Sequence, residues 1–120
     1  MQSIRKDYKG RLKMLVFNLK KEWFNKIKSG EKTHEYREVK PYWTTRIENY
    51  FGNFWCNVER LKRGGIHYPL FKNIIFRKGY TGEKLHARVY SIKIVDGTHS
   101  DLKINKDVYD IEFTLIKDNK

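Results

Sequence analysis

The segment between Gly30 and Pro41 sets the order of three elements, because each of these residues ends one element and allows another to begin. Residues 20–30 carry apolar side chains at helical spacing and end in glycine, which favours the conformation that follows a helix. In residues 32–39 the side chains fall into two alternating sets, as they do on the two faces of a strand. Proline breaks that strand but suits the first turn of a helix, so residues 41–51 are predicted to be helical.

The remaining elements are predicted from apolar runs and turn signals. Residues 52–70 contain a KRGG turn signal but no clear period, and they are interpreted as an extended hairpin or an irregular insert. Apolar residues alternate along the stretch after Gly82, but the alternation shifts by one position near Tyr90, which predicts a β-bulge or a bend. Further strands are predicted at residues 14–19, 72–80, 85–95 and 108–117.

This order predicts a small α+β domain. Several strands and two flanking helices in about 100 residues favour a curled β-barrel of about five to six mostly antiparallel strands. A chain of 120 residues fits one domain with one modest core. Residues 1–12 are interpreted as a basic N-terminal tail, and residues 13–120 as the domain, with the uncertain insert inside it.

Charge is the strongest feature of the composition. The chain has 26 Lys and Arg against 14 Asp and Glu, a net charge of +12. Residues 1–40 hold 12 basic and 5 acidic side chains, residues 41–80 hold 7 and 2, and residues 81–120 hold 7 and 7. A polyanion is the natural partner of such a surface, although charge of this kind also serves solubility alone.

Several classes of function are not favoured by this sequence. The single cysteine, Cys56, allows no intramolecular disulfide, which predicts a reducing compartment and a buried or half-buried thiol. The absence of a long apolar run and of a secretory leader predicts a cytoplasmic protein that does not enter a membrane. The four histidines are scattered without metal-ligand spacing, so no metal and no cofactor are predicted.

The segment after Gly30 concentrates charged and aromatic side chains. Strand alternation places Glu35 and Arg37 on one side, Lys32 lies at the turn before them, and Tyr42 and Trp43 follow directly after the proline. Rings stack on bases, cations hold phosphate and a carboxylate accepts from an exocyclic amine, so these five residues predict a nucleotide or RNA site. The alternative is structural: Glu35 and Arg37 form a plain ion pair, and both rings belong to the core.

The stretch LVFNLKKEWFNKIKSGEKTHEYREVKPYW resembles the opening of the ASCH domain, a family with the PUA-like β-barrel fold. The resemblance rests on an apolar strand, a helix and then a G-x-K-x-x-E-x-R motif, which stands here as Gly30, Lys32, Glu35 and Arg37. The match continues into KPYWTTRI, and it extends over roughly residues 13–117, apart from the insert.

Further along, IIFRKGY is similar to the strand of this family that ends in an F-R-x-G-Y turn, which adds Arg77 and Tyr80 to the candidate site. The resemblance implies a basic cleft between the barrel and the helices. Such a cleft is suited to binding RNA or a nucleotide-like ligand, with Lys32, Glu35, Arg37, Tyr42, Trp43, Arg77 and Tyr80 as candidate ligand-binding residues.

Two other functions stay open. One branch of the family hydrolyses N4-acetylcytidine with the motif lysine, a threonine three positions later and a glutamate from elsewhere. Lys32 matches that lysine, but Glu35 stands at the threonine's position, and Thr33 is displaced from it. A small hydrolase acting on a modified nucleoside or on RNA would then use Lys32 and Glu35 as its acid/base pair. The third possibility is a protein-interaction module with an unspecified partner.

Overall fold

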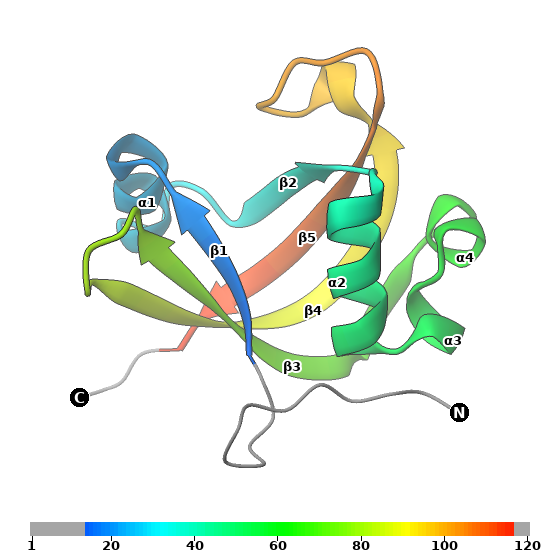
Figure 1. Ribbon diagram of the computed structural model, residues 1–120, viewed down its shortest axis with the longest axis horizontal. Coiled ribbons are helices and arrows are strands. Elements are labelled where there is room, and N and C mark those ends of the chain that lie inside the picture. The colour runs from blue at the N-terminus through cyan, green and yellow to red at the C-terminus, as the bar shows by residue number, and fades with distance from the viewer. Residues whose placement is uncertain (1–13, 117–120) are drawn as a thin grey trace.

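One five-stranded sheet curls into a half-barrel, and helices lie at its end and across its opening (Figure 1). This computed structural model describes residues 14–116, and of residues 67–71 only that they belong to a strand. The predicted N-terminal tail at residues 1–12 lies outside the described part. The elements are β1 Leu15–Leu19, α1 Lys21–Lys28, β2 His34–Glu38, α2 Pro41–Phe51, α3 Asn53–Cys56, α4 Val58–Lys62, β3 Ile66–Lys78, β4 Lys84–Asp96, the 3₁₀ turn η1 Gly97–His99 and β5 Asp107–Leu115.

The sheet has the strand order β1-β3-β4-β5-β2. Strand β1 pairs with β3 in parallel, and the three remaining pairs are antiparallel. The prediction of a mixed α+β domain with a curled, mostly antiparallel sheet is therefore confirmed. The described residues contain four α-helices rather than the two expected, because the insert contributes α3 and α4.

The local signals of the first half act as predicted. Helix α1 ends at Lys28, and Gly30 follows with φ of 88°, a left-handed conformation that glycine adopts without strain. Helix α2 begins at Pro41. Proline has no N–H group to donate, and at the first position of a helix an N–H group would have no intrahelical acceptor, so no hydrogen bond is lost. In β4 the pairing with β5 shifts register between Val89 and Ser91, which confirms the bulge predicted near Tyr90.

Residues 52–70 form two short helices and the start of β3. The side chain of Asn57 caps α4 by accepting a hydrogen bond from the backbone N–H of Arg60 at 2.9 Å. The chain then reverses through Gly64 and Gly65, which have φ of 128° and 80°. Gly65 packs tightly on β4, since a Cβ there would lie 2.5 Å from the carbonyl oxygen of Ile92. The turn signal was therefore correct, but the helices before it were missed.

The core fills the concave side of the sheet. Phe76 on β3 packs between Phe17 on β1 and Phe113 on β5, with ring centroids 5.9 and 4.7 Å apart. The helices close this core with Phe24, Ile27, Ile47, Phe51 and Leu61, all of them buried. Cys56 is buried as predicted, and its burial raises the pKa of the thiol to about 12. No helix within residues 14–116 is both long and apolar enough to cross a lipid bilayer.

Candidate functional site

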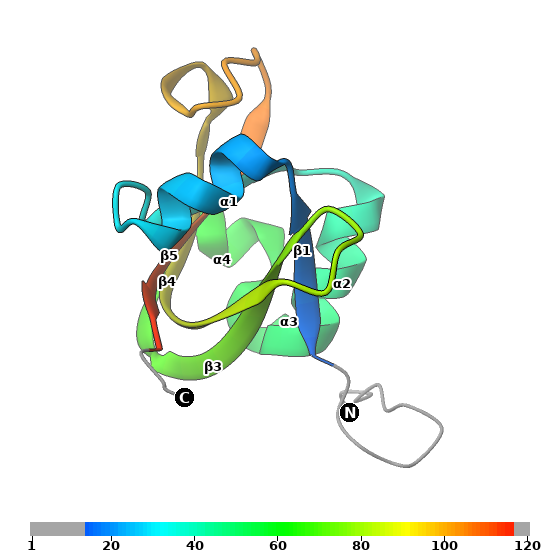
Figure 2. The same cartoon turned by 90° about the vertical axis from the view of Figure 1, so that its left-hand side faces the viewer.

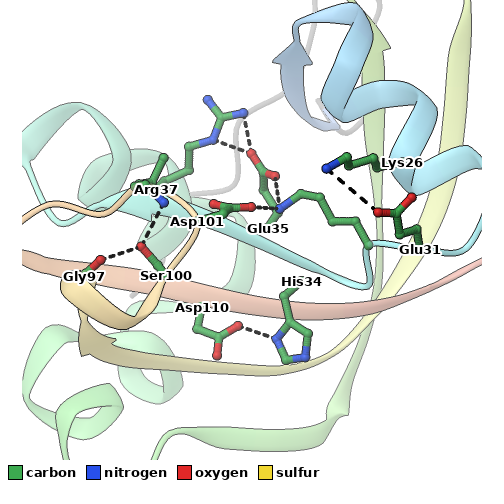
Figure 3. A network of polar contacts seen from close by, with 11 residues as sticks. Lys26, Glu31, His34, Glu35, Arg37, Gly97, Ser100, Asp101 and Asp110 are labelled. Carbon is green, nitrogen blue, oxygen red and sulfur yellow. Dashed lines mark hydrogen bonds and ion pairs between the residues drawn. The ribbon is translucent and has the colours of Figure 1, made fainter.

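Three segments meet beside the C-terminal end of α1 and bring four charged side chains together (Figure 3). The Lys32 ammonium lies 2.6 Å from a carboxylate oxygen of Asp101 and 3.5 Å from one of Glu35. The guanidinium of Arg37 donates a hydrogen bond from Nε to Glu35 at 2.7 Å and forms an ion pair with the same carboxylate oxygen through Nη2 at 2.6 Å. We call Lys32, Glu35, Arg37 and Asp101 the motif cluster. Strand β2 supplies Glu35 and Arg37 on one face, as its alternation predicted.

Glu35 is the buried centre of the motif cluster, with 4% of its surface exposed. Its desolvation raises the pKa of the carboxyl above the ordinary value, even though the neighbouring cations Arg37 and Lys32 act to lower it. Glu35 thus forms ion pairs with both cations, yet its carboxylate takes up a proton more readily than a carboxylate in water does. This combination is typical of residues that transfer protons, but it is also found in structural ion pairs.

Both cations of the motif cluster lie against aromatic faces. The guanidinium of Arg37 is 4.8 Å from the ring centroid of Trp43 and 5.1 Å from that of Phe17, and these two rings stack on each other. The ammonium of Lys32 is 5.6 Å from the ring of Trp23 and 5.2 Å from that of Tyr36. Such contacts stabilise each cation electrostatically, in addition to its pairing with a carboxylate.

The two aromatic residues predicted on α2 differ in their surroundings. Trp43 is half-buried between the core and Arg37, so one of its faces is already covered by protein. Tyr42 is 53% exposed and carries the guanidinium of Arg46 over its ring at 3.5 Å. Tyr42 also packs edge-to-face on Trp43, with ring centroids 5.0 Å apart, which places it beside the motif cluster. Tyr42 and Arg46 therefore present a ring and a cation to solvent at this point.

Asp101 was not predicted from the sequence. It lies in the loop that follows η1, 69 positions after Lys32. Internal hydrogen bonds brace this loop: the Ser100 hydroxyl donates to the Gly97 carbonyl at 2.8 Å and accepts from the N–H of Leu102 at 3.1 Å (Figure 3). The signal available in the sequence was a short polar loop containing one aspartate, which does not indicate its distant partner.

Arg77 and Tyr80 stay outside the motif cluster. Arg77 follows Phe76, which is fully buried, so strand alternation directs Arg77 to the opposite face of β3. It lies in register with Asn18, which is exposed. Tyr80 lies in the turn between β3 and β4 and is 95% exposed. The family motif that suggested these two residues therefore occupies a different part of the surface.

A second polar group lies on the other face of β2. The ring of His34 approaches Asp110 at 2.6 Å through Nδ1 and Glu112 at 3.6 Å through Nε2, and Tyr90 donates to Glu112 at 2.8 Å. These groups satisfy one another. Within residues 14–116 no group of three or more His, Cys, Asp or Glu side chains is arranged to hold a metal ion.

With all four groups ionised, the charges of the motif cluster sum to zero, so an anion that approached Lys32 would compete with a carboxylate for it. Asp101 is the candidate for exchange, because its side chain is 30% exposed while that of Glu35 is 6% exposed. Comparison with other proteins adds no family to this description. Neither a protein-family model nor a curated protein matches the chain.

Proposed function

We propose that this chain is a PUA-like domain of the ASCH type that binds RNA or a nucleotide-like ligand at the motif cluster. The single observation that carries the proposal is the placement of Lys32 and Arg37 on aromatic faces around the buried carboxylate of Glu35. Cations, rings and one hydrogen-bond acceptor are the groups that recognise phosphate, base face and exocyclic amine. The curled sheet with its two edge strands is consistent with the PUA-like part of the proposal.

In this proposal a ligand phosphate takes the place of the Asp101 carboxylate. The carboxylate already occupies the position of an anion on Lys32, at 2.6 Å, and its exposure allows it to move aside. A base then lies towards the exposed Tyr42, whose ring is presented to solvent with Arg46. Glu35 remains in place as an acceptor, because a hydrogen bond and an ion pair from Arg37 hold its carboxylate.

The wider surface supports a polyanionic ligand. The chain has 26 basic and 14 acidic side chains, a surplus of 12 positive charges. The whole of this surplus belongs to residues 1–80, which include α1, β2 and α2 around the motif cluster. Each phosphate that such a surface neutralises releases counterions, which favours binding of a polymer over binding of a single nucleotide.

Replacement of Asp101 by asparagine is expected to tighten RNA binding about fivefold, equivalent to about 1 kcal/mol. The substitution removes the anion that competes for Lys32 and keeps the shape of the side chain. Fluorescence anisotropy with a labelled RNA measures the change. Glu31→Gln is the matched control, because it removes a nearby carboxylate that pairs with Lys26 rather than Lys32. Equal effects of the two variants, or weaker binding by Asp101→Asn, would contradict the exchange of Asp101 for phosphate.

A second candidate function is hydrolysis of a modified nucleoside of the N4-acetylcytidine type, or of RNA. The observation that favours it is the 3.5 Å approach of the Lys32 ammonium to Glu35, a buried carboxyl with a raised pKa. Such a pair can exchange a proton with a substrate. No threonine stands at the position that the amidohydrolase pattern requires.

Turnover of N4-acetylcytidine and of labelled RNA, with and without divalent metal, tests this second function. Lys32→Ala is expected to abolish genuine turnover. Lys26→Ala is the matched control, because Lys26 also lies over the ring of Trp23, at 5.1 Å, but pairs with Glu31 outside the motif cluster. Activity that survives Lys32→Ala belongs to a contaminant or to another site, and rejects this function for the motif cluster.

A further inference from the structure

Two aromatic rings on α3 are exposed, although the residue beside them is buried. Phe54 is 63% exposed and Trp55 is 52% exposed, and their rings pack edge-to-face with centroids 4.8 Å apart. Cys56, the next residue, is fully buried and anchors this short helix to the core. Exposed aromatic side chains of this size are found mainly where a protein meets a partner.

One arginine, Arg60, contacts both rings, and a second, Arg63, lies on the turn after α4. The guanidinium of Arg60 lies 5.1 Å from the ring of Phe54 and 5.4 Å from that of Trp55, and its Nε donates to the Phe54 carbonyl at 3.2 Å. The Arg60 guanidinium is thus held by two rings and a backbone carbonyl. Arg63 pairs with Glu59 at 3.5 Å, but both side chains are more than three-quarters exposed, so this pair is weak.

A hollow of about 290 Å³ opens along α4, and Arg60 belongs both to its lining and to the contacts with the two rings. This volume lies near the lower end of the range for small-molecule sites, about 300–1,000 Å³, and it suits one flat ring rather than a large cofactor. We call Phe54, Trp55 and this hollow the α3–α4 surface. The hollow is lined by Asn57, Glu59, Arg60, Arg63 and Gly65.

We propose that the α3–α4 surface binds a segment of single-stranded polynucleotide, separately from the motif cluster. Bases stack on Trp55 and Phe54, and Arg60 and Arg63 bind the phosphates on either side. Glu59 accepts a hydrogen bond from the amino group of a base that enters the hollow. Exposed rings interleaved with arginines suit a ligand that has both a flat ring and negative charge, and this charge complementarity favours a nucleic acid over a protein.

The proposal goes beyond the function proposed above, because it concerns another part of the molecule. Figures 1 and 2 place α3 and α4 on the side of the molecule away from α1. The motif cluster lies next to α1 and β2. The two surfaces can therefore be tested by separate substitutions.

The test measures binding of fluorescein-labelled oligouridine and oligodeoxythymidine of roughly twelve nucleotides, a length that covers one such surface. Trp55→Leu and Arg60→Gln are each expected to weaken binding about tenfold. Trp55→Phe is expected to restore most of the affinity, since a ring is again available for stacking. Arg88→Gln is the matched charge control, because Arg88 is an exposed arginine on β4. Binding of RNA or of DNA supports the proposal, and their ratio identifies which polymer is preferred.

Several results would overturn the proposal. Equal effects of Arg60→Gln and Arg88→Gln, together with no effect of Trp55→Leu, would show that general charge alone binds the polymer. Lack of binding at low salt by the folded protein would reject it outright, as would a stoichiometric protein partner that occupies Trp55 and resists nuclease. Loss of binding with Lys32→Gln but not with Trp55→Leu rejects this surface and keeps the motif cluster. The reverse pattern rejects the motif cluster alone.

Discussion

RNA binding by this protein is expected to weaken about a thousandfold when salt rises from about 50 to 200 mM, if about six phosphates are contacted. The physical cause is the release of condensed counterions by a protein whose net charge is +12. Binding constants measured at four or more salt concentrations give the slope of log affinity against log salt. Lys32→Gln is expected to reduce the magnitude of this slope by about one if Lys32 contacts a phosphate.

An oligonucleotide analogue with a neutral backbone and the same bases provides the control for this measurement. It keeps the rings but has no counterions to release, so its affinity should respond little to salt. A flat salt response of the RNA itself would mean that phosphates are not the bound groups. In that case the surplus of lysine and arginine serves solubility, and the proposed nucleic-acid function loses its electrostatic basis.

Replacement of Arg37 by methionine is expected to lower the free energy of unfolding by about 3 kcal/mol at neutral pH. The reason is that Glu35, which is 4% exposed, loses its hydrogen bond and ion pair with the guanidinium and keeps only the ammonium of Lys32 at 3.5 Å. Methionine retains an apolar chain beside Phe17 and Trp43, so the loss reports mainly on charge. Urea denaturation at several pH values measures the effect.

The pH dependence follows from the direction of the Glu35 shift. Burial raises the pKa of this carboxyl in the folded protein, so the folded state holds the proton more readily than the unfolded state. The contribution of Glu35 to stability therefore falls as pH rises from the pKa of the unfolded chain through that of the folded protein, and then levels off. Removal of Arg37, a neighbour that lowers this pKa, raises it further. The deficit of Arg37→Met should therefore shrink as the solution becomes more acidic.

The double variant Glu35→Gln with Arg37→Met is the control for this prediction. A neutral amide needs no counter-charge, so the double variant should recover most of the stability that Arg37→Met loses. An equal deficit at acidic and neutral pH, without recovery in the double variant, would show that Arg37 contributes by packing on the two rings rather than by pairing with Glu35.

Local signals made much of the fold predictable from the sequence. Gly30 and Pro41 bound the strand between α1 and α2 because their backbone preferences act within one or two residues. The alternation of apolar residues shifts by one position near Tyr90, and this shift located the bulge in β4. It is also a local signal, because successive side chains of a strand point to opposite faces. Such features depend on neighbours in the chain and not on the rest of the fold.

The segment between α2 and β3 could not be predicted in this way. Helix α3 has four residues and α4 has five, which is too short for a helical period to be distinguished. Their formation depends on burial of Cys56 and Leu61 against the rest of the core and on the Asn57 cap. These are tertiary contacts, and the sequence alone indicated only the turn that follows them.

The candidate site was predicted in part. The spacing of Glu35 and Arg37 placed them on one face of β2, where the structure joins them, but the same spacing was compatible with a plain ion pair. Asp101 was missed because its approach to Lys32 is a tertiary contact between residues 69 positions apart, set by the position of the loop after η1. Arg77 was expected at the site from a motif, yet strand alternation next to Phe76 directs it elsewhere.

The edge strands β1 and β2 face each other across the gap in the half-barrel, and Arg37 reaches from one to the other. Its guanidinium donates to the carbonyl oxygen of Asn18 on β1 at 3.3 Å while it stacks on the ring of Phe17. The two edge strands are thus linked here by a side chain rather than by the backbone hydrogen bonds of strand pairing. Loss of that side chain, as in Arg37→Met, therefore removes a tie between two edge strands together with the partner of Glu35, while every backbone strand pair keeps its hydrogen bonds.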